Sequence, residues 1–266
     1  LYGPVSVGPL SGRRLPYVDN LVRLVVSENP GEVGMDEILR VLAPLGVAYV
    51  KRGDQWTKTV KPWPEEIDEW QQHFHDADNN AVSRDTVVGP PRRHQWIADP
   101  QWMRSHMSMP SISSFVSSKG RLFTVEDRAS AEHPALPGKF TLVARDAFNG
   151  IVLWQREFPD WHPVNIRTKV TPVQLQRRLA AVGDVVYCTP GFTAPVTALD
   201  AATGKVLQTY EDTQRTTEFL YDRGVLYVVI GDPTDTDGIG AGGTLSTSEF
   251  PPKAYGPKIP VLPDPK

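Results

Sequence analysis

A five-residue pattern that occurs twice, 54 residues apart, constrains the fold of this 266-residue chain more than any other feature. The copies are residues 146–150, Asp-Ala-Phe-Asn-Gly, and residues 200–204, Asp-Ala-Ala-Thr-Gly, and apolar runs flank both. The aspartate and the following Asn or Thr satisfy local backbone donors, and glycine supplies a positive φ. Each copy therefore predicts a β-hairpin, and the fixed spacing indicates a structural repeat.

A second kind of hairpin is predicted at residues 115–125, 179–187 and 219–229, where β-rich runs surround a glycine turn and include an aromatic residue near the end. One such hairpin followed by an Asp-Ala-x-x-Gly hairpin makes a four-stranded antiparallel sheet, the blade of a β-propeller. We expect two nearly complete blades, a partial blade before them and the beginning of another after them. Because a ring closes with ~4–8 blades, this propeller is incomplete, and further blades of a longer chain or a protein partner would complete it.

Residues 198–208 resemble the repeat of the pyrroloquinoline quinone (PQQ) propeller family, Ala-Leu-Asp-Ala-x-Thr-Gly-x-x-x-Trp, except that Gln208 replaces the tryptophan. Residues 144–154 keep Trp154 but depart at the Leu-Asp and Thr-Gly positions. The resemblance implies that Trp154 docks one blade against the next. Residues 70–96 are similar to the tryptophan-led opening strand of quinoprotein-like and BamB-like propellers, which closes the ring by pairing with the last blade.

The first fifty residues predict a strand at 20–26, a helix at 35–42 that Pro44 and Gly46 end, and a strand at 47–50, hence a βαβ unit with a parallel sheet. Residues 15–20 and 37–46 resemble the later half of a class I S-adenosylmethionine (SAM)-dependent methyltransferase, with Leu45 in place of the first turn glycine. The resemblance implies a glycine-rich cofactor loop upstream of Leu1. We favour a leftover α/β element, serving as a cap or interface, over methyl transfer by this chain.

The expected fold is therefore mainly β: an incomplete β-propeller of four-stranded antiparallel blades with a small N-terminal α/β, Rossmann-like segment. Its order resembles large multidomain PQQ-binding-like repeat proteins of planctomycete-type bacteria, and both ends indicate a fragment. The predicted parts are a methyltransferase-like remnant at 1–52, a linker at 53–69 with one or two helical turns at 64–70, blades at 70–232, and a Pro/Gly-rich inter-blade loop or tail at 233–266.

No residue is identified as catalytic, cofactor-binding or metal-ligating. The cluster at 73–80, His-Phe-His-Asp-Ala-Asp-Asn-Asn, offers metal ligands, but turn formers and caps are the favoured interpretation. The run at 232–238 lacks the closing glutamate of a calcium loop, and Gly240–Gly243 lacks the strand and helix of a phosphate loop. Cys188 is interpreted as a small buried hydrophobe, and His106 and His162 as surface or capping residues.

A net charge of −3 gives no basic field for nucleic acid, and no apolar run approaches the ~20 residues of a spanning helix. The first functional hypothesis is a non-catalytic binding or scaffold module that needs no cofactor. The alternatives are a fragment of a PQQ-dependent dehydrogenase, with PQQ and Ca²⁺ in a complete propeller, and a SAM-dependent methyltransferase. A single cysteine excludes the ring of adjacent cysteines found in many PQQ dehydrogenases. The resembling propellers imply a periplasmic or otherwise exported protein, and a cytoplasmic location stays open.

Overall fold

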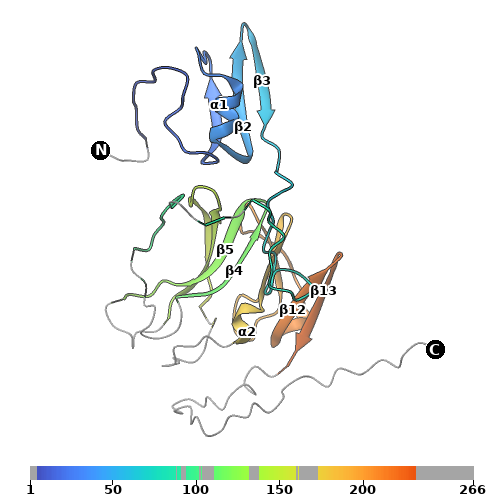
Figure 1. The fold of residues 1–266 in the computed structure, drawn as a ribbon. Coiled ribbons are helices and arrows are strands. Elements are labelled where there is room, and N and C mark those ends of the chain that lie inside the picture. The colour runs from blue at the N-terminus through green and yellow to red at the C-terminus, as the bar shows by residue number, and fades with distance from the viewer. Residues whose placement is uncertain are drawn as a thin grey trace, which may run out of the picture. The chain divides into compact units, whose positions relative to one another are not determined.

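The computed structural model describes residues 5–87, 89–90, 94–101, 103, 111–131, 138–159, 161 and 173–231 (Figure 1). The chain divides into two compact units. The first unit comprises Leu1–Asp68, Arg84–Ala98 and Asp146–Ile151, and the second comprises Glu69–Ser83, Asp99–Arg145 and Val152–Lys266. In the described part of the chain no helix is both long and apolar enough to cross a membrane.

The first unit contains the predicted βαβ arrangement. Strand β1 (Val22–Ser27) runs parallel to β2 (Leu42–Arg52), and helix α1 (Met35–Val41) connects them. Asp36 and Glu37 lie in the first turn of the helix, where their charges complement the helix dipole. The sheet order is β1-β2-β3, so the expectations of a strand, a helix and a parallel strand are confirmed.

The core of this unit lies between α1 and one face of the sheet. Its fully or almost fully buried members are Ile38, Leu42, Ala48 and Val50. Ile38 lies on the buried side of α1, Leu42 is the first residue of β2, and Ala48 and Val50 alternate onto one face of that strand. The unit is therefore held together by a single small apolar layer.

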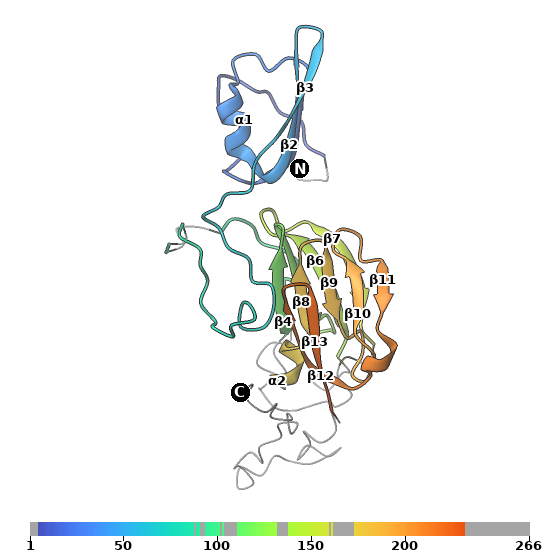
Figure 2. The same cartoon turned by 90° about the vertical axis from the view of Figure 1, so that its right-hand side faces the viewer.

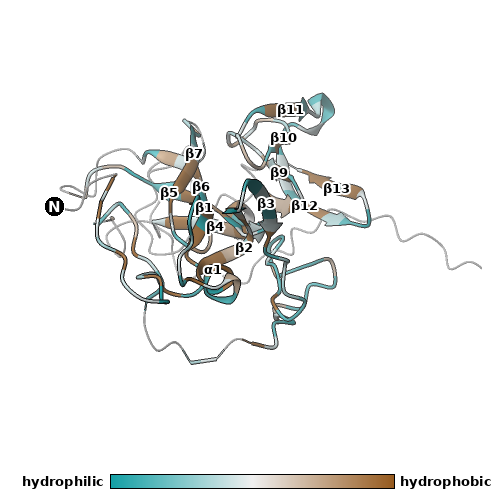
Figure 3. Ribbon diagram, turned by 90° about the horizontal axis from the view of Figure 1, so that it is seen from above, coloured by the Kyte–Doolittle hydropathy of each residue, from teal (hydrophilic) through white to brown (hydrophobic). Residues whose placement is uncertain are grey.

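Strand β3 (Gln55–Val60) occupies a region where the sequence predicts a connector, and this prediction is wrong. β3 pairs antiparallel with β2 through a two-residue turn, in which Gly53 has a φ of 61°. Glycine at that position suits a tight hairpin, and Thr57 and Thr59 are β-branched, so the signal was present. The polar character of β3, visible in Figure 3, obscured it. The helical turns expected at 64–70 are also absent, and this stretch contains one turn at Glu65–Glu66.

The end of α1 differs from the prediction as well. The helix ends at Val41, and Pro44 and Gly46 lie inside β2, where the pairing register with β1 shifts. Leu45 adopts a φ of 64°, the left-handed region that favours glycine. This is the position at which the methyltransferase-like pattern has its first turn glycine.

Replacing Leu45 with glycine is expected to stabilise the first unit by about 0.5–1 kcal/mol, because relief of the left-handed backbone outweighs the added flexibility of the unfolded chain. The Leu45 side chain is 41% exposed, so little apolar burial is lost. Hydrogen exchange of β2 peptides, compared between Leu45→Gly and the parent protein, measures the change. Faster exchange in the variant would contradict the expectation.

The second unit is built from three antiparallel sheets, two of four strands and one of two, ordered β4-β5-β6-β7, β11-β10-β9-β8 and β12-β13. A mainly β fold of four-stranded antiparallel sheets is thereby confirmed, in an open arrangement. Its elements are β4 (Ile112–Ser118), β5 (Arg121–Asp127), β6 (Phe140–Asp146), β7 (Val152–Glu157), α2 (Val173–Gln176), β8 (Leu179–Val182), β9 (Val185–Cys188), β10 (Thr197–Asp200), β11 (Val206–Thr209), the 3₁₀ turn Glu211–Thr213, β12 (Thr216–Asp222) and β13 (Val225–Ile230).

The first strand of each sheet lies beside the first strand of the next. β4 contacts β8 and β8 contacts β12, an arrangement that Figure 2 shows clearly. A core of buried side chains fills the space between the first two sheets, and it includes Phe123, Leu142, Trp161, Leu179 and Val186. The apolar faces of the first two sheets therefore cover one another, as two-layer packing requires.

The expected partial blade before β4 is not present as strands. Among the described residues between 61 and 111, the only β-pairing is two isolated bridges made by Gln72. The extended opening strand expected around Trp96 is therefore wrong for the described residues. The tail predicted at 233–266 lies outside the described residues.

Candidate functional site

The two Asp-Ala-x-x-Gly segments form the predicted hairpin turns. Asp200 Oδ1 accepts hydrogen bonds from the amides of Ala202 (3.1 Å) and Thr203 (2.8 Å), and the Gly204 amide donates to the Asp200 carbonyl at 2.8 Å. Asp146 Oδ1 accepts equivalent bonds at 2.8 and 3.2 Å in the first copy. These turns join the third and fourth strands of the two four-stranded sheets, so they occupy equivalent positions away from the row of β4, β8 and β12.

Trp154 connects the first four-stranded sheet to the second. Its indole Nε1 donates to the carbonyl of Ala201 at 3.0 Å, and its ring covers Gly204, where an added Cβ would come within 2.7 Å of the ring. Gly204 has a φ of 70°, so glycine is needed there both for conformation and for contact. Trp154 is therefore a structural side chain that holds the neighbouring turn.

A second tryptophan makes the same contact with the first copy of the turn. Trp96 Nε1 donates to the Ala147 carbonyl at 2.9 Å, and a Cβ on Gly150 would come within 2.5 Å of the Trp96 ring. The described part of the chain thus contains two equivalent contacts in which a tryptophan ring covers a turn glycine and bonds a carbonyl of the same turn; we call each a tryptophan lock. Trp96 was expected in a strand, and its observed role is to cover this turn.

Residues 70–72, which we call the cross-strand segment, run across the row of first strands. The Ser117 amide on β4 donates to the Trp70 carbonyl at 2.7 Å, and the Trp70 amide donates to Ser117 Oγ at 2.9 Å. One residue later, the Ala181 amide on β8 donates to the Gln71 carbonyl at 2.7 Å. The segment thereby fastens two sheets at their adjoining edges.

Gln72 extends this fastening to the third sheet. Its side-chain Oε1 accepts from the Tyr221 amide on β12 at 2.8 Å, and its Nε2 donates to the Tyr221 carbonyl at 3.2 Å. One amide group thus satisfies both backbone groups of one strand residue. Gln72 is 4% exposed, so these bonds are made away from water, where an unpaired polar group is costly.

Beside the cross-strand segment lies a group of ionisable side chains. Arg177 Nη1 donates to Glu218 Oε2 at 2.7 Å, and the Arg177 guanidinium lies 6.0 Å from the Phe74 ring centre. Burial lowers the pKa of His73, and the nearby positive charge of Arg177 lowers it further. His73 Nε2 is buried without a hydrogen-bond partner. The imidazole is therefore neutral at neutral pH, and the nearby carboxylate of Glu218 is engaged by Arg177 rather than orienting His73 for base catalysis.

Arg178, the next residue, is almost completely buried, with 1% of its surface exposed. Its Nη1 donates to the Phe192 carbonyl at 2.8 Å, and the Trp161 and Phe192 rings lie 4.9 and 5.3 Å from its guanidinium carbon. Burial lowers its pKa to about 10. This environment could not be predicted from the sequence, because an Arg-Arg pair before an apolar strand usually lies on the surface.

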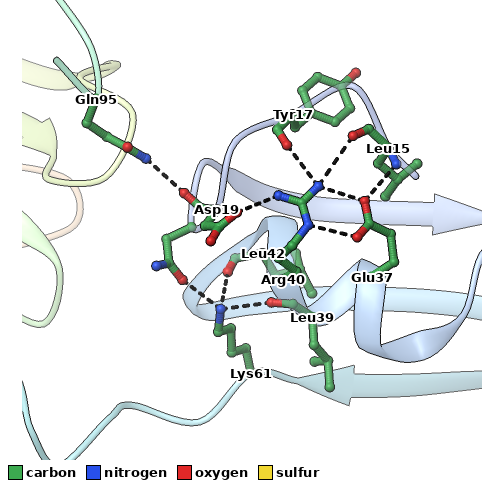
Figure 4. Close-up of polar contacts among 10 residues, drawn as sticks. Leu15, Tyr17, Asp19, Glu37, Leu39, Arg40, Leu42, Lys61 and Gln95 are labelled. Atoms are coloured by element: carbon green, nitrogen blue, oxygen red, sulfur yellow. Dashed lines mark hydrogen bonds and ion pairs between the residues drawn. The ribbon is translucent and has the colours of Figure 1, made fainter. Parts of the chain in front are cut away.

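In the first unit, the two methyltransferase-like segments, 15–20 and 37–46, are joined by the guanidinium group of Arg40 (Figure 4). Arg40 donates to Asp19 Oδ1 at 2.5 Å, to both Glu37 oxygens at 2.6 and 2.7 Å, and to the carbonyls of Leu15 and Tyr17 at 3.3 and 3.0 Å. The network ties the segment before β1 to α1. Each of the Arg40 nitrogens in this network donates to a protein oxygen, so the role of the network is structural.

The Glu37 carboxylate has a pKa lowered from 4.5 to about 2, chiefly by its hydrogen bonds from Arg40. A carboxylate whose folded pKa is lowered contributes stability above its unfolded pKa, and this contribution is lost as the pH falls through the folded pKa. Glu37→Gln is therefore expected to lower the urea midpoint of the first unit at pH 7, with the difference shrinking between pH 4.5 and about 2. A difference that stays constant over that range would contradict this explanation.

Cys188 is buried, as expected, and burial raises the pKa of its thiol to about 12. The thiol is therefore neutral and shielded in the folded protein. We expect a thiol-specific reagent at pH 8 to leave Cys188 unmodified in the native protein and to modify it completely in denaturant. Rapid reaction under native conditions, followed by the absorbance of the released chromophore, would contradict the assignment.

The polar cluster at 73–80 forms turns. Asp76 Oδ1 accepts from the Asp78 amide at 2.9 Å and Asp78 Oδ1 from the Asn80 amide at 2.8 Å, while the His75 ring packs edge-on against Trp70 at 5.4 Å. Within the described residues, no three His, Cys, Asp or Glu side chains are placed to share a metal ion. His106, His162, 232–238 and 240–243 lie outside the described residues.

Comparison with known proteins assigns the chain to no family. It matches no protein-family model, and no curated protein matches it.

Proposed function

We propose that this chain is a non-catalytic binding or scaffold module, formed by part of a β-propeller of the PQQ-repeat type. Three features support the architecture: the repeated four-stranded sheet order, the row of first strands β4, β8 and β12, and the tryptophan lock between successive sheets. The two-stranded sheet β12-β13 would be the start of a third blade, which further strands or a protein partner would complete. We place the protein outside the cytoplasm, because the propellers that it resembles are usually exported.

The cross-strand segment is the observation that carries the functional proposal. In the propellers that the sequence resembles, the first strands surround the axis on which dehydrogenases seat the quinone. Here residues 70–72 bond to all three first strands. The backbone of residues 70 and 71 and the buried Gln72 side chain occupy the surface of this row of strands. This arrangement supports a role in fastening the sheets together better than it supports a cofactor site.

The proposal is tested by adding PQQ and Ca²⁺ to the purified chain. We expect no quinone absorbance to be retained after gel filtration and no dye-linked oxidation of alcohols. Retention of quinone in stoichiometric amount together with dye reduction would replace the proposal with a PQQ-dependent dehydrogenase.

The N-terminal segment requires its own test. We propose that it is a methyltransferase-like remnant, supported by the parallel βαβ unit and by the Arg40 network that joins the resembling residues. Adding SAM is expected to leave the melting temperature unchanged, because no glycine-rich G-x-G-x-x-G loop joins a strand to a helix among the described residues. A SAM-dependent rise in melting temperature would favour methyl transfer instead.

A further inference from the structure

The Arg178 guanidinium has one unused edge. Its Nη1 bonds the Phe192 carbonyl at 2.8 Å, whereas Nε and Nη2 are buried without a hydrogen-bond partner. Nε and Nη2 lie on the same side of the planar group and point their N–H bonds in nearly the same direction. This is the geometry that binds the two oxygens of a carboxylate in parallel.

The surroundings of Arg178 favour a planar ligand. Trp161 and Phe192 lie 4.9 and 5.3 Å from the guanidinium carbon. Aromatic rings at such distances occupy the faces of the cation and leave hydrogen bonding to its plane. A flat anion lying in that plane would use the free edge without displacing either ring.

The residue at the neighbouring position of the strand pairing carries a buried hydroxyl group. Leu179 on β8 pairs with Cys188 on β9, so Arg178 and Thr189 are the next positions at the same end of the hairpin. Thr189 is completely buried, and its Oγ1 also has no hydrogen-bond partner. Two residues that directly flank the β8-β9 hairpin thus present unsatisfied polar groups in the protein interior.

No described carboxylate lies within ion-pair distance of Arg178, in contrast to Arg177, which pairs with Glu218. A buried cation without a counter-ion is strongly disfavoured, and so are buried donors without acceptors. A bound anion would supply both a counter-charge for the cation and acceptors for its unused N–H donors.

We propose that Arg178 binds the carboxylate of a small organic anion through Nε and Nη2, with the Thr189 hydroxyl as a further donor. The proposal does not depend on the propeller assignment, since it needs only the β8-β9 hairpin and the two rings. Bonding through a fixed edge selects an anion with two oxygens on one atom over a spherical halide of the same charge.

The test compares sodium acetate with sodium chloride at equal ionic strength on the full chain. At a concentration about 100 times its dissociation constant, acetate is expected to raise the melting temperature by about 5 °C relative to chloride. Line broadening of ¹³C-labelled acetate in the presence of the protein gives a second measure of binding that does not depend on unfolding.

Arg178→Met and Arg177→Met distinguish a specific site from a general effect of arginine. Replacement of an unpaired buried charge by an apolar chain of similar length preserves folding, so Arg178→Met is expected to remain folded and to lose both responses to acetate. Arg177→Met is expected to keep both. Equal melting temperatures in acetate and chloride for the parent protein, or an acetate response that persists in Arg178→Met, would overturn the proposal.

Discussion

Replacing Trp161 with alanine is expected to lower the free energy of unfolding of the second unit by about 3–5 kcal/mol. The Trp161 ring is completely buried, lies 5.3 Å from the Phe158 ring and covers the Arg178 guanidinium. Its Nε1 also donates to Ser113 Oγ at 3.2 Å. The substitution therefore opens a large cavity, removes a buried hydrogen bond and uncovers the Arg178 charge, which no described carboxylate neutralises.

Hydrogen exchange of peptides from β4 to β6 measures this loss directly, because the slowest amides there report opening of the whole unit. Tyr227→Ala serves as the control, since Tyr227 is 55% exposed on β13, and its loss is expected to stay below about 1 kcal/mol. If Trp161→Ala costs no more than the control, the space between the first two sheets is not the core that the structure indicates.

Replacing Gly204 with alanine is expected to destabilise the second unit by about 2–3 kcal/mol, from two separate causes. A φ of 70° is unfavourable for any residue with a Cβ and costs about 1 kcal/mol. The new Cβ would also come within 2.7 Å of the Trp154 ring, which must shift and weaken its bond to the Ala201 carbonyl.

The chain provides a matched control for the second cause. Gly183 has a φ of 60°, but nothing lies within 4 Å of the Cβ that alanine would add, so Gly183→Ala is expected to cost only about 1 kcal/mol. In a protein that already carries Trp154→Ala, the loss of stability caused by Gly204→Ala should fall to that of Gly183→Ala, because the ring that the new Cβ would meet is gone. Equal losses at Gly183 and Gly204 in the parent protein, measured by urea unfolding, would show that the tryptophan does not press on the turn.

The hairpins of the second unit were predictable because their signals are local. An Asp-Ala-x-x-Gly turn specifies its own hydrogen bonds and its own positive φ, and the repeat places two such turns at equivalent points. The βαβ unit was predictable for a similar reason, since helix and strand periodicities differ within a few residues. The strand order within each four-stranded sheet is that of strands consecutive in the chain pairing with one another, the usual arrangement.

The features that define the candidate site were not predictable, because they depend on residues far apart in the chain. Nothing near Gln72 indicates that its side chain meets Tyr221, 149 residues later. Likewise, Arg177 and Arg178 are identical in the sequence pattern, yet one pairs with Glu218 and the other is buried without a partner among the described carboxylates. The strand β3 was missed for a different reason: its polar composition outweighed a clear hairpin turn.

The cross-strand segment also determines the order in which the protein is completed on the ribosome. Gln72 is synthesised 149 residues before Tyr221, which corresponds to roughly 7–30 s of translation at typical rates. During that interval the Gln72 side chain cannot make its bonds to Tyr221, whereas the segment has already been synthesised when β4, β8 and β12 follow one after another. Each of these strands can therefore pair with the segment as it emerges, and the bonds to β12 form only after translation has passed Tyr221.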